Sequence, residues 1–164
     1  MSTARTANLL GALALALSDE IRDAAERQAI HGGGTPAALS LVGHEPGLSI
    51  DALARMLGMS HPGAVRLVQR LEQDRLIARK PTSDGRTVAL HLTVAGRKRR
   101  ARLLAERRTV LEQALKRLSA QERTQLATLV EKLLVGIKRD PLHAYAICRF
   151  CEETVCHPCP MAGG

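Results

Sequence analysis

Apolar residues recur every three and four positions near the start of the chain. Leu10, Leu13, Leu17, Ile21 and Ala24 fall on one stripe, which predicts a first helix over about residues 6–30. The glycines at 32–34 end this helix, because glycine accepts the left-handed conformation beyond a helix end. Thr35 followed by Pro36 then predicts an N-cap and a short helix reaching about residue 42.

Two short helices and a hairpin are predicted next. Ser49 and Ser60 stand where N-caps are expected, and Gly58 ends the first of the two helices. The second helix has an apolar face and an opposite polar face. The apolar residues are Ala64, Leu67, Val68 and Leu71, and the polar ones are Arg66, Gln69, Arg70 and Gln73. A period of two then predicts strands at 77–80 and around Val88, Leu90 and Leu92, joined by a turn that carries Asp84, Gly85 and Arg86.

The chain returns to a helical pattern from Thr93 to about Arg139. Ser119 and Glu122 have the spacing of a capping box, so a new helix is expected to begin there. Asp140-Pro141 is expected to stop it. The organisation predicted is a helical region (1–47 and 94–140), a winged helix-turn-helix (48–93) and a cysteine-rich tail (141–164).

Composition narrows the classes of function. Hydrophobic residues make up 45% of the 164 residues but aromatic residues only 1%, which favours helices and argues against modules that stack bases on aromatic rings. The formal net charge of +8 predicts an anionic partner. No apolar run reaches the roughly 18–20 residues of a membrane span, so no membrane partner is expected.

These elements suit double-stranded DNA. A helix with Arg66, Gln69 and Arg70 on its polar face fits the major groove. An arginine at the hairpin tip, Arg86, suits the narrower minor groove, and Arg79 and Lys80 suit phosphates. The basic run at 97–102 either touches the DNA backbone or is a solvated helix face.

Residues 48–98 resemble the multiple-antibiotic-resistance regulator (MarR) family of bacterial transcription factors. The matching stretches are residues 53–60 (LARMLGMS), 68–72 (VQRLE), 84–86 (DGR) and 92–96 (LTVAG), and the order of helices extends the resemblance to about 5–140. The resemblance implies a mainly α (α+β) fold, a winged helix-turn-helix with long N- and C-terminal dimerisation helices.

The resemblance also implies a function. It suggests a cytoplasmic, nucleoid-associated bacterial homodimer that binds a palindromic operator, usually as a repressor, and responds to a small-molecule or redox inducer. Ser60, Arg66 and Arg70 would contact DNA from the recognition helix, Asp84 would brace the wing and Arg86 would enter the minor groove. Residues 61–65 (HPGAV) depart from the family, which has hydroxyl or amide side chains there, so base reading is expected to rest on His61, Arg66 and contacts with thymine methyl groups.

The tail carries all four cysteines as C-x2-C-x4-C-x2-C: Cys148, Cys151, Cys156 and Cys159. Paired cysteines at this spacing indicate a metal site, either zinc, which is slightly favoured, or an iron–sulfur cluster. Redox thiols that form disulfides and incidental thiols are the alternatives, and His157 is more readily placed outside the ligand set. Because the tail follows the dimerisation helix, a metal or redox site there is hypothesised to tune operator binding.

No set of nucleophile, base and acid, P-loop or dinucleotide fingerprint is found, so no enzyme is predicted. Two other classes stay open. One is a metal-handling or redox protein that works through its tail, and the other is a non-specific architectural DNA binder.

Overall fold

The computed structural model describes residues 2–28, 34–82 and 88–161. Along these segments the elements are α1 (Thr3–Gln28), α2 (Thr35–His44), α3 (Ile50–Leu57), α4 (His61–Gln73), β1 (Ile77–Pro81), β2 (Val88–Leu92), α5 (Val94–Leu115), α6 (Ala120–Ile137) and α7 (Pro141–Ile147). The strands pair antiparallel, with Ile77 opposite Leu92 and Pro81 opposite Val88. The predicted mainly helical, winged helix-turn-helix fold is confirmed.

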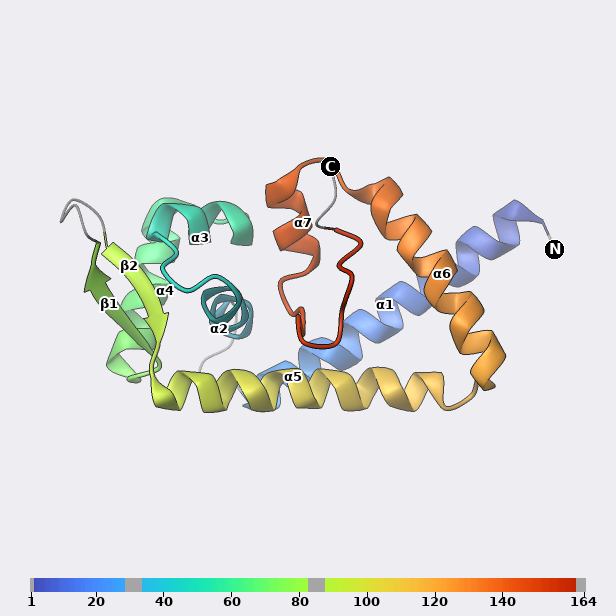
Figure 1. Ribbon diagram of the computed structural model, residues 1–164, viewed down its shortest axis with the longest axis horizontal. Helices are drawn as coiled ribbons and strands as arrows, with labels where there is room; N and C mark the ends of the chain where they lie inside the picture. Colours follow the sequence, from blue (N-terminus) through green and yellow to red (C-terminus); the bar gives the residue numbers. More distant parts are fainter. Residues whose placement is uncertain (1, 29–33, 83–87, 162–164) are drawn as a thin grey trace.

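The elements from α2 to β2 form one end of the molecule, here called the winged head (Figure 1). Helix α5 leaves the head and runs along the lower edge of the view, and α6 turns back at its far end. Helix α1 crosses behind and packs against α5. The chain after α6, here called the tail (residues 138–161), returns to the centre, between α2 and α6.

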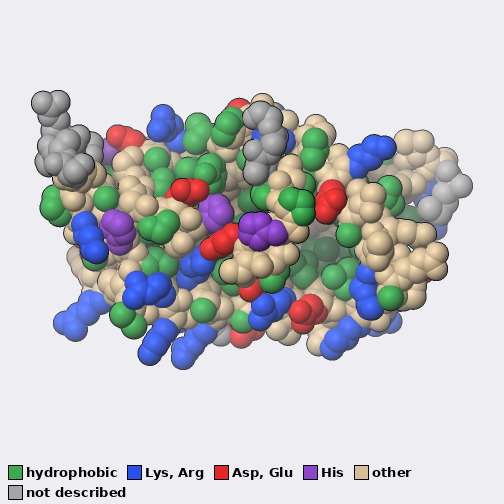
Figure 2. Space-filling model, in the orientation of Figure 1, with side chains coloured by type: hydrophobic (Ala, Val, Ile, Leu, Met, Phe, Trp, Pro, Cys, Tyr) green, Lys and Arg blue, Asp and Glu red, His purple; other side chains and the backbone are tan. Residues whose placement is uncertain are grey.

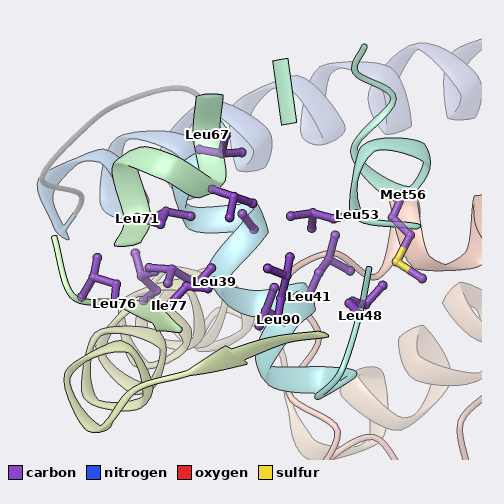
Figure 3. Close-up of a cluster of buried hydrophobic side chains, with 14 of the residues drawn as sticks. Leu39, Leu41, Leu48, Leu53, Met56, Leu67, Leu71, Leu76, Ile77 and Leu90 are labelled. Carbon is purple, nitrogen blue, oxygen red and sulfur yellow. The ribbon is translucent and has the colours of Figure 1, made fainter. Parts of the chain in front are cut away.

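The core lies inside the winged head (Figure 3). Leucines from α2, α3, α4 and β2 meet there with 1% or less of their surface exposed: Leu39, Leu41, Leu53, Leu67, Leu71 and Leu90. Full burial of one such side chain contributes about 1.5–3 kcal/mol. The head therefore has an apolar core, and packing in this core fixes the positions of the helices and strands that carry its surface residues.

The head is joined to α5 by close backbone contacts. Thr93 caps α5, because its Oγ1 accepts from Gly96 N (3.0 Å), and the same hydroxyl donates to the Arg75 carbonyl (2.6 Å). A Cβ on Gly96 would collide with the Leu76 carbonyl oxygen, so only glycine allows this approach. The start of α5 is thus held against the root of the hairpin.

Most predicted helix boundaries are confirmed by their caps. The side chain of Ser49 accepts from Ala52 N (3.1 Å), and Gly58 takes the left-handed conformation (φ 62°). Ser119 and Glu122 form the expected capping box. The first helix spans 3–28 rather than 6–30.

Two sequence predictions need correction. Thr35 lies inside α2 and is buried, and the N-cap is Gly34. Asp140 begins a helix, α7, by accepting from His143 N (2.8 Å), where only a stop was expected. In β2, Val88 is 39% exposed where it pairs with Pro81, whereas Leu90 is fully buried. Among the described helices, none is both long and apolar enough to cross a membrane.

Candidate nucleic-acid interface and cysteine tail

Helix α4 shows one face to the core and the other to solvent. Its inner residues are fully buried: Ala64, Leu67, Val68 and Leu71. Its outer residues are exposed: Arg66, Gln69, Arg70 and Gln73. The predicted division of the helix is confirmed, and the side chains predicted to reach DNA are unobstructed within the described chain. Their contact with DNA stays a prediction.

The start of α4 is held by two polar side chains. Ser60 Oγ accepts from Gly63 N (3.3 Å), which uses a lone pair and leaves the hydroxyl proton for another acceptor. His61 Nδ1 lies 2.6 Å from Asp51 Oδ1 of α3. Since a carboxylate only accepts, Nδ1 carries the proton there, and Nε2 is the ring atom left to meet a base or phosphate. Asp51 therefore orients His61, a role that sequence reasoning missed.

The hairpin residues differ in their surroundings. Arg79 Nε lies 2.8 Å from Glu72 Oε2, and both side chains are 31% exposed, so Arg79 ties the hairpin to α4. Lys80 is exposed. Asp84 and Arg86, predicted to brace and to form the wing tip, lie outside the described residues.

The basic run at the start of α5 splits into two groups. Lys98 and Arg102 are exposed, and Arg97 Nη1 donates to the Leu92 carbonyl (3.0 Å). Arg100, in contrast, is only 16% exposed and points inward, with Nε donating to the Ser40 carbonyl of α2 (3.3 Å). Figure 2 shows Lys and Arg side chains along the lower edge, where α5 runs. The run is therefore not one uniform solvated face.

Two acidic residues of the tail neutralise arginines of α5. Glu153 Oε2 accepts from Arg100 (2.7 Å) and lies 3.4 Å from His44 Nδ1 of α2. Glu152 Oε1 accepts from Arg108 (2.8 Å). Partial burial raises the pKa of Glu153, but hydrogen bonds from its own backbone and from Arg100 outweigh burial and hold that pKa below the ordinary value. We call these pairings the clasp.

Helix α7 also contacts the head. Tyr145 donates its hydroxyl to Glu45 Oε1 (2.7 Å), and its ring meets His44 edge-on at 6.0 Å. The hydrogen bond to Glu45, then burial and the Glu45 charge, raise the pKa of Tyr145. Sequence reasoning missed the clasp and this contact, although an acidic pair between two cysteine pairs of a basic chain was a usable signal.

A cavity of about 470 Å³ lies between α2, β2, α5 and the tail. Arg97, Arg100, His91 and Glu153 are among the residues that line it. Its walls combine arginines, the two tail glutamates and apolar side chains, and Arg97 is a lining arginine that neither tail glutamate pairs with.

The four tail cysteines are free and each is partly buried. Burial, then the neighbouring Cys159 and Cys156, raise the pKa of Cys148, and burial and the other three cysteines raise the pKa of Cys151 to about 11. The thiols thus share one region. Among the described residues, however, no three His, Cys, Asp or Glu side chains are already gathered as metal ligands.

Residues 35–87 match the model of the MarR family, which covers α2 to the hairpin. This chain carries a MarR-family domain. The match spans the exposed face of α4 and both predicted wing residues, Asp84 and Arg86. None of the curated proteins compared with the chain matches it.

Solved MarR-type structures resemble the whole arrangement. YusO from Bacillus subtilis is 24% identical (81% of this chain, 97% of that one, TM-score 0.68). MepR, a regulator of the Staphylococcus aureus multidrug efflux pump MepA, is 18% identical (84% and 100%, TM-score 0.69), and a MepR variant has been solved bound to an oligodeoxyribonucleotide. The Mycobacterium tuberculosis MarR family protein RV2887, in complex with salicylic acid, is 28% identical (76% and 93%, TM-score 0.59). The fold is therefore that of MarR-family proteins.

Proposed function

We propose that this protein is a homodimeric, sequence-specific DNA-binding regulator that represses transcription by occupying a palindromic operator. The observation that carries the proposal is the exposed polar face of α4, supported by a packed core within a MarR-family domain. Arg66, Gln69 and Arg70 project from that face, and a helix of this kind fits the major groove. The MepR variant bound to an oligodeoxyribonucleotide supports the same use of the fold.

The homodimer is supported by apolar surface at the far end of the molecule. Helix α6 has no buried residue within this chain. Five of its apolar side chains are 41–59% exposed: Leu129, Val130, Leu133, Val135 and Ile137. Helix α1 exposes Leu9, Leu10 and Leu13 to a similar degree. An apolar stripe of this size needs a partner, and a second copy of the chain supplies the same stripe. Two heads related by a twofold axis would then read a palindrome.

The cavity beside the clasp is the proposed site of a small anionic inducer. RV2887 has been solved with salicylic acid, a carboxylate, and Arg97 and His91 line the cavity here. Because Arg100 and Arg108 are already paired with the tail, a carboxylate would use Arg97 or displace a tail glutamate. The tail itself is proposed to tune operator binding through a metal or redox site.

The experiment is selection of duplexes from a random pool, followed by fluorescence anisotropy with the enriched duplex and a scrambled one. A regulator should prefer the enriched duplex by about a thousandfold or more. Arg70→Ala should weaken operator binding, whereas Arg117→Ala, which removes the same charge beyond the end of α5, should not. Equal affinity for both duplexes would refute the proposal and indicate a non-specific architectural binder.

A further inference from the structure

The two cysteine pairs flank the residues that form the clasp. Cys148 and Cys151 precede Glu152 and Glu153, and Cys156 and Cys159 follow them. A turn brings the first pair together, because Cys151 N donates to the Cys148 carbonyl (2.7 Å). A second turn, from Val155 N to the Glu152 carbonyl (3.1 Å), reverses the chain between the pairs. The acidic residues therefore stand on the loop that joins the two cysteine pairs.

Three of the four cysteines border the same hollow of the molecule. Cys148, Cys151 and Cys156 line one hollow beside α1 and α5, and all four are partly buried and free of disulfides. Met161, just beyond the last cysteine, is buried, and its carbonyl accepts from Lys138 Nζ (2.9 Å). The tail is thus anchored on both sides of the cysteines: at Lys138 and Met161, and through Tyr145 to the head.

We infer that Cys148, Cys151, Cys156 and Cys159 bind one zinc ion as thiolates, and that the ion holds the clasp closed. Four thiolates in two C-x2-C pairs form a closed tetrahedral set, which is the arrangement of structural zinc. The ion displaces the four thiol protons to solvent, so the step needs no oxidant or reductant. The described structure does not yet gather the thiols around one point. Zinc binding must therefore draw them together, and the free energy of zinc binding then orders the loop between the two pairs.

Zinc and the clasp act on the same contact between head and α5. Arg100 binds the Ser40 carbonyl of α2 with one end of its guanidinium and Glu153 with the other. Arg108, two turns further along α5, binds Glu152. An ordered loop keeps both carboxylates in place, whereas a free loop must give up its conformational entropy each time the pairs form. This second part rests on the proposed function, because its readout is operator affinity.

The zinc site is tested without DNA. The full chain, purified without oxygen and without a His tag, should contain one zinc per chain, and Co²⁺ added to metal-free protein should give the visible spectrum of a tetrahedral thiolate site. Cys148→Ser with Cys151→Ser should abolish both signals. His157→Ala is the matched control and should keep them. No bound metal, or iron with sulfide in place of zinc, would overturn the zinc site.

The effect of zinc on the head through the clasp is tested with variants that leave all four cysteines unchanged. Removal of zinc from wild type should change affinity for the selected operator about fivefold or more. Glu152→Gln with Glu153→Gln should still bind one zinc but lose that change. If this variant responds to zinc as wild type does, the clasp is refuted while the zinc site stands. A wild type that binds zinc but prefers no duplex would refute only the proposed function.

Discussion

Gly43→Ala tests the position of Arg100 without altering a charge. Gly43 lies in the last turn of α2, where alanine normally stabilises a helix by up to about 1 kcal/mol over glycine. Here a Cβ would collide with the Cδ and Nε atoms of Arg100 and come within 2.9 Å of Leu92 Cδ1. Arg100 cannot easily move aside, because its guanidinium is held by Ser40 and Glu153. Gly43→Ala should therefore destabilise the protein if Arg100 lies against Gly43, and stabilise it if Arg100 does not.

The expected magnitude follows from these contacts. Overpacking of this kind costs about 1–3 kcal/mol, and displaced hydrogen bonds of a charged group add to that cost. After the helix gain is subtracted, Gly43→Ala should lower the free energy of unfolding by about 1–3 kcal/mol. In an Arg100→Ala background the two colliding atoms are gone and only a terminal methyl of Leu92 must rotate. The same substitution should then be neutral or stabilise by up to about 1 kcal/mol.

Urea unfolding followed by circular dichroism measures all four proteins of this cycle. Protein concentration must be held constant, since a dimer's stability depends on it. Gly11→Ala is the matched control within one chain, because no atom of the same chain lies within 4 Å of its added Cβ, and it should not destabilise the fold of the chain. If Gly43→Ala stabilises wild type, Arg100 does not occupy the position described, and the geometry of the clasp is wrong.

Three further predictions use other parts of the chain. Arg70→Ala should reduce the slope of log affinity against log salt by about 1, measured by anisotropy over a salt series; an unchanged slope would place Arg70 off the phosphates. Leu133→Asp should convert a dimer into monomers in sedimentation equilibrium, because it puts a charge on the apolar stripe of α6; an intact dimer would exclude α6 from the interface. Tyr145 is the only tyrosine and the sequence has no tryptophan, so phenolate absorbance reports on Tyr145 alone. The pKa of Tyr145 should lie above the ordinary value of 10.0 in the folded protein and should fall in Glu45→Gln. Because the folded pKa is raised, the Tyr145–Glu45 contact stabilises the protein fully below pH 10 and loses this contribution as the pH rises through the folded pKa. Equal titration midpoints of Tyr145 in the folded and the urea-unfolded chain would show that α7 is not docked.

The helices and strands of the winged head were predicted well because interactions between residues close in sequence determine where they begin and end. Serine caps, the left-handed glycine at 58 and the period of the apolar residues act over a few positions, and each agrees with the structure. Thr35 shows the limit of such rules. It has the sequence of a cap, but burial against the core drew it into the helix and left the cap to Gly34.

The site was less predictable because its key contacts are distant in sequence. Arg100 and Glu153 are 53 positions apart, and Tyr145 and Glu45 are 100 apart. No periodicity or spacing relates such residues. A run of basic residues at 97–102 predicts a charged surface, and only tertiary packing shows that Arg100 turns inward while Lys98 and Arg102 remain exposed.

If the tail tunes operator binding as proposed, α5 is the element through which it would act. Helix α5 is fixed to the head at its first turn, where Gly96 meets the Leu76 carbonyl and Thr93 binds Arg75. About one turn further on, Arg100 adds a second attachment, through Ser40 to α2 and through Glu153 to the tail. Helix α5 also shares the apolar core of the head through Leu103, and we expect the Arg100 attachment to restrain the tilt of the head further. In the proposed homodimer the two heads would have to match the spacing of two half-sites, so a change in tilt would alter affinity without any change at α4. We therefore expect Arg100→Ala to weaken the operator complex while leaving the salt slope intact, because no phosphate contact is removed.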